Sequence, residues 1–286
     1  MSLIFLENVS FHYLKDTPLE RTALRNISLS ITEGERIGIF GETGSGKSTL
    51  IQLFNGLLQP TEGRVYLKGK DIREWSIKEI CKIIGLVFQY PEHQLFGETV
   101  FEEVVFGPRN VGFKEEEMET IVKRALNTVG LKYEEIKDRS PFSLSGGEKR
   151  RLAIASVLAM DPEVLVLDEP TANLDPKGKR EIMQYLNNWA KKGKTLIIVS
   201  HDLDEIIPLI HRVIVLHKGN LIFDGSKDLL FKQKQKIIEM GLELPQILEI
   251  VEILEKKGYP VNGYMTLNEM AEIILAYKGY TALWKC

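Results

Sequence analysis

Long apolar runs, cysteines and an excess of charge of either sign are all scarce in this sequence of 286 residues. No uninterrupted apolar stretch approaches the roughly 20 residues that a membrane-spanning helix needs. Residues 1–7 contain no basic region followed by a long apolar segment. We therefore expect a cytoplasmic chain, and if it works at a membrane, another chain must cross that membrane.

The two cysteines, Cys81 and Cys286, are far apart in the sequence and have no metal-ligand spacing. This is typical of a reducing compartment and gives no disulfide framework. The formal net charge is −3, with acidic and basic residues interleaved, so the overall balance indicates neither a nucleic-acid surface nor a polyanionic tail. Any partner must therefore be inferred from motifs.

Short apolar runs alternate with helix-period segments along most of the chain. Residues 36–40 have the pattern of a buried strand and lead into a glycine-rich turn. Such alternation predicts an α/β fold with a largely parallel sheet covered by helices. The other predicted strands are Leu3 to Phe11, Ile27 to Ile31, Ile83 to Phe88, Val164 to Leu167, Leu196 to Val199 and Val213 to Leu216.

The pattern changes at residues 224–226. The roughly sixty residues that follow have no strand pattern of comparable strength and no phosphate-binding motif. We therefore expect a small helical appendage with at least two helices. The residues that indicate these helices are Ile247, Val251 and Leu254 before Gly258, and the capping-box pair Thr266 and Glu269.

A glycine-rich loop lies between the predicted strand at 36–40 and a helical stretch at 49–58, and it satisfies the G-x-x-x-x-G-K-[ST] pattern. Its glycines let backbone N–H groups surround a triphosphate, the helix start is electropositive, and Lys47 adds a full charge. Ser48 can place its hydroxyl on Mg²⁺. The loop indicates a nucleotide and magnesium, but a kinase, a GTPase and a transport ATPase all remain open. Its residues are Gly41, Glu42, Thr43, Gly44, Ser45, Gly46, Lys47, Ser48 and Thr49.

Two carboxylates follow the predicted strand at 164–167. Folds of this kind hold the magnesium shell with a carboxylate at that place, so Asp168 is predicted to do so. Glu169 can reach the water that attacks the γ-phosphate, as its general base or as its positioning group. An Asp-Glu pair alone is weak evidence, because most such pairs are solvated loop residues.

A second glycine-rich helix start lies upstream of the acidic pair, before the helix-period run at 151–159. Two glycines and a serine at a helix start can bind an anion. Two such starts with only one lysine loop suggest that they serve different nucleotides. At this point the sequence resembles the ATP-binding cassette (ABC) family, from about Leu3 to Gly225 and with the motifs in the family's order. The residues of this signature are Leu144, Ser145, Gly146, Gly147 and Glu148.

The resemblance implies the ABC ATPase form of the P-loop NTPase fold. It implies an ATPase domain at 1–225, with a helical signature subdomain inserted at about 90–160, and a small C-terminal helical extension at 226–286. In this family the signature of one subunit closes over the γ-phosphate held by the phosphate loop of its partner. The signature at 145–148 is therefore expected to act in trans, in a dimer that binds ATP and Mg²⁺.

Single residues also match the family's motifs. Gln89 matches the glutamine loop, which contacts magnesium and the attacking water and faces the membrane partner. His201 matches the histidine that hydrogen-bonds the γ-phosphate, and Asp175 matches the loop that crosses the dimer interface. Tyr13 matches the aromatic residue that stacks on adenine, although a tyrosine at a strand end is often only packing.

The segment after Gln89 is unusually apolar and aromatic. Its sequence resembles the corresponding segment in the ATPases of energy-coupling factor transporters, which import vitamins and cobalt or nickel ions. In those proteins the region docks short helices of a transmembrane coupling subunit, and a groove of Leu95, Phe96 and Phe101 would suit an amphipathic helix. The alternative is a tightly packed helical subdomain.

The tail resembles that of the same ATPases at Leu244-Pro245, at residues 258–261 and at residues 266–269, and in that family it helps to hold two ATPase subunits together. A regulatory or merely stabilising extension is the alternative. The implied partners are a second ATPase subunit, identical or paralogous, a transmembrane coupling subunit and a substrate-binding membrane subunit, with no nucleic acid. The chain would then be a peripheral ATPase on the cytoplasmic face of the cell membrane, a translocase.

Two rival functions fit less well. A soluble ABC ATPase of DNA repair or translation would share the catalytic motifs, but those classes carry a long coiled-coil insertion or two cassettes in tandem, and this sequence has neither. A P-loop kinase or GTPase would have no reason to carry the signature at 144–148.

Overall fold

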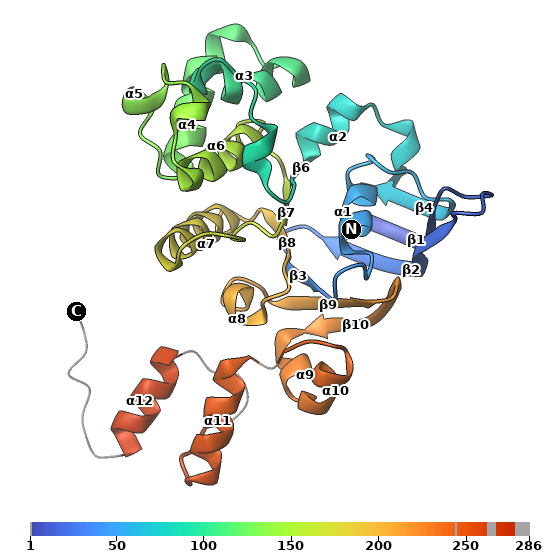
Figure 1. The fold of residues 1–286 in the computed structure, drawn as a ribbon, viewed down its shortest axis with the longest axis vertical. Coiled ribbons are helices and arrows are strands. Elements are labelled where there is room, and N and C mark those ends of the chain that lie inside the picture. Colours follow the sequence, from blue (N-terminus) through green and yellow to red (C-terminus); the bar gives the residue numbers. More distant parts are fainter. Residues whose placement is uncertain (1, 244, 262–266, 278–286) are drawn as a thin grey trace.

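The computed structural model describes residues 2–243, 245–261 and 267–277. Figure 1 shows two β-sheets at the middle of the molecule, a lobe of helices on one side of them and the C-terminal helices on the opposite side. The α/β fold predicted from the strand and helix alternation is confirmed.

A six-stranded sheet forms the centre, in the order β10-β9-β3-β8-β7-β6. Strands β9, β3, β8, β7 and β6 run parallel, and β10 pairs antiparallel with β9 at one edge. Every residue of β7 and β8 is buried, which explains their continuous apolar runs. The strands are β3 (Arg36–Phe40), β6 (Ile84–Val87), β7 (Val164–Asp168), β8 (Thr195–Val199), β9 (Arg212–His217) and β10 (Asn220–Ser226).

A second sheet of four antiparallel strands has the order β2-β1-β4-β5. The sequence analysis predicted a largely parallel sheet and did not predict this antiparallel one. It did predict parts of the two long strands in it. Strand β4 escapes a search for apolar runs because its first three residues are exposed and polar or glycine. The strands are β1 (Ser2–Tyr13), β2 (Arg21–Thr32), β4 (Glu62–Leu67) and β5 (Lys70–Asp71).

The two faces of the central sheet carry different cores. On β7, Leu165 and Leu167 pack with the helical lobe, whereas Val164 and Val166 pack with the antiparallel sheet and the first helix. Side chains alternate across a strand, so one short run serves both cores. The central sheet is thus covered on both faces, and its loops emerge only at the strand ends.

The helical lobe is a chain insertion between β6 and β7. It packs around α6, whose neighbours are α3, α4 and the short helix η2. Its elements are η2 (Pro91–Gln94), α3 (Val100–Val111), η3 (Glu115–Glu117), α4 (Met118–Thr128), α5 (Tyr133–Ile136), η4 (Pro141–Ser143) and α6 (Gly146–Leu158). The elements between strands elsewhere are α1 (Lys47–Phe54), η1 (Ile72–Glu74), α2 (Ile77–Ile83), α7 (Pro176–Ala190) and α8 (Leu203–Ile206).

Helices follow β10 to the end of the described chain. The predicted helix around Ile247, Val251 and Leu254 is confirmed, and all three side chains are buried. Thr266, the predicted cap of the next helix, lies outside the described residues. These helices are α9 (Lys227–Phe231), α10 (Lys234–Glu239), α11 (Gln246–Lys256) and α12 (Leu267–Tyr277). Within the described ranges, none of the helices has the length and hydropathy required to cross a membrane.

Candidate functional site

The phosphate-binding loop leaves the end of β3 and closes onto the start of α1. It packs tightly on its surroundings: a Cβ atom added to Gly41 would lie 2.1 Å from the carbonyl oxygen of Leu216, and one added to Gly46 would lie 2.6 Å from that of Ala23. Both glycines have positive φ, 144° and 105°. Only glycine fits these two places, because a side chain would be both strained and in collision with backbone.

Lys47 folds back over this loop. Its ammonium donates hydrogen bonds to the carbonyl oxygens of Gly41, at 2.7 Å, and Glu42, at 3.0 Å. Burial lowers the pKa of Lys47, and the nearby carboxylates of Glu169 and Asp168 oppose that shift. A partly buried cation at the start of a helix favours a polyanionic ligand.

The hydroxyl of Ser48 donates a 2.8 Å hydrogen bond to Oδ2 of Asp168, across 120 residues of sequence. Asp168 is the buried last residue of β7, and burial raises its pKa, while the bond from Ser48 and the charge of Lys47 lower it. The predicted magnesium ligands Ser48 and Asp168 are therefore brought together. A hydroxyl and a carboxylate oxygen are ligands of the kind that Mg²⁺ prefers, and a cation would favour the ionised form of the buried acid.

Glu169 and His201 form a second contact at the same edge of the sheet. Nδ1 of His201 lies 2.8 Å from Oε1 of Glu169. The carboxylate is largely buried, the imidazole is exposed, and the backbone of Glu169 has a φ of 48°, a left-handed conformation that is uncommon for residues other than glycine. The predicted base and the predicted phosphate-contacting histidine thus touch each other.

Gln89 and Tyr13 lie near this edge without joining either contact. Gln89 is exposed and follows β6, which pairs with β7, so it lies beside the strand end that carries the two acids. The hydroxyl of Tyr13 is 3.0 Å from Oγ1 of Thr49 in the first turn of α1. Its ring meets that of Phe11 edge to face, so Tyr13 lies at the phosphate loop, where stacking on a base stays a prediction.

The signature is an exposed capping box at the start of α6. Oγ of Ser145 accepts a hydrogen bond from the backbone N–H of Glu148, at 3.3 Å, and the carboxylate of Glu148 accepts one from the N–H of Ser145, at 2.8 Å. The hydrogen bond that the Ser145 hydroxyl donates to the carboxylate of Glu148, at 2.7 Å, and the one from the Ser145 N–H lower the pKa of Glu148. A Cβ atom on Gly146 or Gly147 would meet nothing within 4 Å, so the helix start faces open space.

The signature shares a hollow of about 440 Å³ with the predicted interface loop. Ser145 and Gly147 line it from one side, and Asp175, the N-cap of α7, lines it from the other. None of the described residues that line this hollow belongs to the phosphate loop at 41–49. The signature and the phosphate loop therefore do not share this hollow within one chain.

Arg150 is a functional candidate that the sequence analysis missed. It lies on α6, only 1% exposed, and its guanidinium donates hydrogen bonds to the carbonyl oxygens of Glu169, Pro170 and Ala172. Arg150 is the middle residue of three consecutive basic residues, at 149–151, and such a run is typical of a solvated helix face. Only the packing of α6 against the loop after β7 gives it this position.

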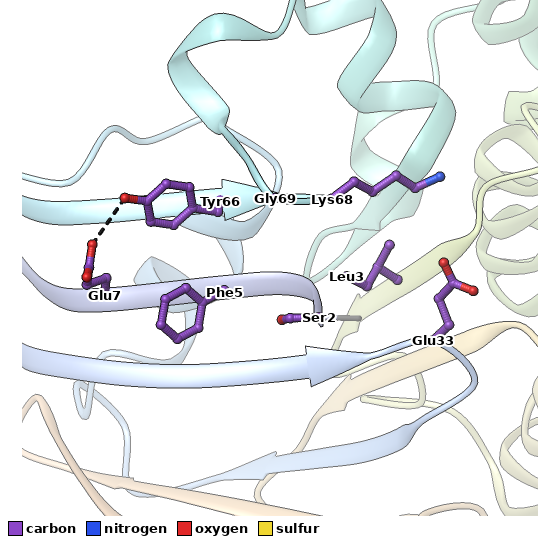
Figure 2. A pocket seen from close by; sticks show the side chains of 8 residues that line it. All are labelled: Ser2, Leu3, Phe5, Glu7, Glu33, Tyr66, Lys68 and Gly69. Carbon is purple, nitrogen blue, oxygen red and sulfur yellow. Dashed lines mark hydrogen bonds between the residues drawn. The ribbon is translucent and has the colours of Figure 1, made fainter.

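A larger hollow, of about 580 Å³, lies on the antiparallel sheet, away from these residues. Figure 2 shows the rings of Phe5 and Tyr66 side by side, with the hydroxyl of Tyr66 bonded to Glu7. It contains none of the predicted site residues. The phosphate loop, the acidic pair, Gln89 and His201 lie instead at the carboxyl ends of β3, β6, β7 and β8, the edge where ligands bind in open α/β sheets.

Comparison with known sequences agrees with this geometry. The pattern of the "ABC transporter" family matches residues 24–172. The energy-coupling factor transporter ATP-binding protein EcfA2 of Clostridium tetani is 46% identical over 272 residues, which is 94% of each chain. The protein of the same name from Caldanaerobacter subterraneus is 47% identical over 278 residues, 96% of this chain and 97% of the relative.

Solved structures are similar in the same way. The cbiO1 protein of Clostridium perfringens, described as part of the ABC transporter complex cbiONQ, is 40% identical with a TM-score of 0.72, over 88% of this chain and 99% of that one. A dimeric ATP-binding cassette, MJ0796, bound to ADP and phosphate, is 33% identical with a TM-score of 0.69, over 78% and 98%.

A phosphate loop, an acidic pair and a signature on this fold, together with near-full-length identity to such subunits, establish that the chain belongs to the ABC transporter family and, within it, to the ATP-hydrolysing subunits of energy-coupling factor transporters.

Proposed function

We propose that this ATPase drives import through a dimer in which Glu169 is the general base and two composite sites form between subunits. The observation that carries the proposal is the meeting of two side-chain pairs beside the phosphate loop. These pairs are Ser48 with Asp168 and Glu169 with His201. They bring two candidate oxygen ligands for a cation and a candidate base to one strand edge, which supports the proposal.

Binding begins with the loop at 41–49. Its backbone N–H groups and Lys47 would take the β- and γ-phosphates, exchanging the carbonyl partners of Lys47 for phosphate oxygens. Oγ of Ser45 is buried and has no hydrogen-bond partner among the described residues, which suits a site completed by a ligand. Tyr13 would then lie beside the base of ATP.

Magnesium fits the residues present. Ser48 and Asp168 would hold it, with Gln89 reaching in from the end of β6. When bound, Mg²⁺ would neutralise charge that develops on the phosphate oxygens.

Glu169 would accept the proton of the attacking water. The hydrogen bond between its carboxylate and Nδ1 of His201 holds the carboxylate at the strand edge. The rest of the imidazole ring is exposed to solvent. The signature of a partner subunit would close the site from the opposite side with the N–H groups at 145–147. Loss of the γ-phosphate would remove what joins the two subunits, so they would separate.

The membrane contact would be made by the segment after Gln89. Phe96 and Phe106 are 59% and 51% exposed, and their rings pack edge to face at 4.8 Å. Leu95 lines no groove, contrary to expectation, because it is buried in the core of the lobe, and Phe101 packs against that core. An exposed aromatic pair suits the apolar side of a helix from a transmembrane coupling subunit.

The remaining partners follow from this arrangement. We infer a second ATPase subunit, identical or paralogous, a substrate-binding membrane subunit, and a place on the cytoplasmic face of the membrane. The cargo would be a vitamin or a cobalt or nickel ion. The extension at 226–286 would help to hold the two ATPase subunits together, and the division of the chain at 225 is part of this proposal.

The test is Glu169→Gln. This variant keeps the shape of the side chain and its bond to His201 but cannot accept a proton, so turnover should fall by about 10²- to 10⁴-fold while ATP affinity stays within about twofold. Steady-state phosphate release and equilibrium nucleotide binding measure the two quantities. Glu116→Gln, at an exposed glutamate of η3, is the matched control; full turnover by Glu169→Gln would refute the assignment.

A further inference from the structure

Among the residues that the structure describes, Arg150 is the largest side chain that is completely buried. A buried guanidinium is costly unless its donors are paired, and burial lowers the pKa of this group. Its donors reach the three carbonyl oxygens of residues 169, 170 and 172. One planar group therefore fixes the backbone that carries Glu169.

The counter-ion of Arg150 comes from another part of the chain. A carboxylate oxygen of Glu92, in η2, lies 3.6 Å from Nη1 of Arg150. That oxygen is buried and has no hydrogen-bond partner within the described part of the chain. Glu92 follows Gln89 by three residues, and η2 packs directly on α6. The ion pair thus joins the segment after Gln89 to the loop after β7.

We propose that Arg150 is a positioning residue for catalysis, and that Glu92 sets its position, so that a displacement of the segment after Gln89 is passed to the carboxylate of Glu169. The proposal rests on the role of Glu169 as base given above. The backbone of Glu169 has a φ of 48°, a conformation that persists only where its surroundings hold it. The three carbonyl bonds of Arg150 supply that hold.

The geometry of the pair of Glu92 and Arg150 explains how a small movement of η2 would reach the loop that carries Glu169. The separation of 3.6 Å leaves the carboxylate of Glu92 attracted to Arg150 without a short hydrogen bond. The guanidinium, in contrast, is bonded rigidly to the loop of Glu169. A shift of η2 would therefore pull on the whole guanidinium and on the three carbonyl groups together. Lysine could not replace arginine here, because an ammonium lacks the planar fork.

The decisive variant is Glu92→Gln in the full-length chain. It keeps the volume of the side chain and removes the charge that holds Arg150, so kcat should fall by about tenfold while KM for ATP and the unfolding temperature stay near wild type. Glu116→Gln, which removes an exposed charge in the same lobe, should change none of the three. A merely structural role would lower the unfolding temperature and leave kcat of the folded fraction unchanged.

A second variant makes the test independent of any single substitution. Arg150→Lys should lower kcat further than Glu92→Gln, and the double variant should be no slower than Arg150→Lys alone, because both changes act through one contact. If Arg150→Lys does not fold, the kcat of Glu92→Gln still decides.

The outcomes separate this proposal from the one on which it rests. Wild-type kcat in Glu92→Gln, or additive losses in the double variant, would overturn the positioning role while an inactive Glu169→Gln leaves the base assignment intact. Full turnover by Glu169→Gln would instead remove the base assignment and this proposal with it.

Discussion

Burial shifts the pKa of Lys47 down and that of Asp168 up, so each side chain is less inclined to carry its charge than it would be in water. Each is also next to the other's charge, which only partly offsets burial. A polyphosphate beside Lys47 and a cation beside Asp168 would restore the charged forms. The two shifts therefore favour ligands of opposite charge at these two side chains.

Alanine substitutions at Gly44 and Gly46 would measure how tightly the phosphate loop is packed. Both have positive φ, but a Cβ atom on Gly46 would strike the carbonyl of Ala23, whereas one on Gly44 would meet nothing within 4 Å. Gly44→Ala should cost about 1 kcal/mol of unfolding free energy from backbone strain alone, and Gly46→Ala about 3 kcal/mol or more from strain plus collision. Denaturant unfolding without nucleotide measures both, and equal losses would contradict the packing described here.

Some features of the site could be predicted from the sequence and others could not. Lys47, Ser48, Asp168 and Glu169 stand in motifs whose spacing is fixed by a strand end, so sequence alone could place them at one sheet edge. The bond between His201 and Glu169 could not be predicted, because it depends on the neighbouring order of β8 and β7. Which groups are buried is likewise a property of the packed fold.

The segment from η2 to α3 is the element that connects the sheet edge to the outer surface of the lobe. Its inner side supplies Leu95 to the core and its outer side exposes Phe96 and Phe106. Exposed aromatic side chains packed on each other are a common centre of protein interfaces. This exposure supports the proposed membrane contact on the outer side of this element.

Replacing Phe96 and Phe106 together by serine tests this placement. Both are exposed, so the isolated chain should keep its unfolding temperature and its ATP turnover within about twofold, whereas recovery of an integral membrane partner from mild detergent should fall at least about tenfold. Leu19→Ser, at an exposed leucine of the β1–β2 connection, is the control. Undiminished recovery of the membrane partner with the double variant would move the contact elsewhere.

Among the elements, the buried strands were the most predictable and the polar ones the least. Strand β3 has the predicted bounds, because the four residues after the half-buried Arg36 are buried and a buried strand segment is apolar. Strand β6 is shorter than predicted, since Ile83 ends α2 instead of starting the strand. Strand β10 alternates exposed and half-buried residues at the sheet edge, so its sequence lacks a comparable apolar run.

At the scale of the whole molecule, the signature and the phosphate loop lie in different places on one chain, because the hollow of Ser145 and Asp175 includes no described residue of the phosphate loop. This separation supports the proposal that a second chain brings its signature to Lys47 and the reverse. A paired arrangement with one contact used twice follows the usual symmetry of dimers.

Mixed dimers can show this exchange. Lys47→Met and Ser145→Arg should each abolish turnover alone. An equal mixture should regain about a quarter of wild-type turnover, because half of the dimers are mixed and each mixed dimer keeps one complete site. Phosphate release from the mixture, compared with each unmixed variant, is the measurement. A mixture no more active than its components would mean that each site is completed within one chain.

The capping box of Ser145 and Glu148 has a consequence for how two subunits meet. Its reciprocal hydrogen bonds already hold the first turn of α6 in a helical form within the single chain. The N–H groups there do not have to be ordered when a partner arrives, so this surface loses little conformational entropy on association. In the proposed dimer, this surface would be ready to meet a partner as soon as each chain has folded, before any nucleotide is bound.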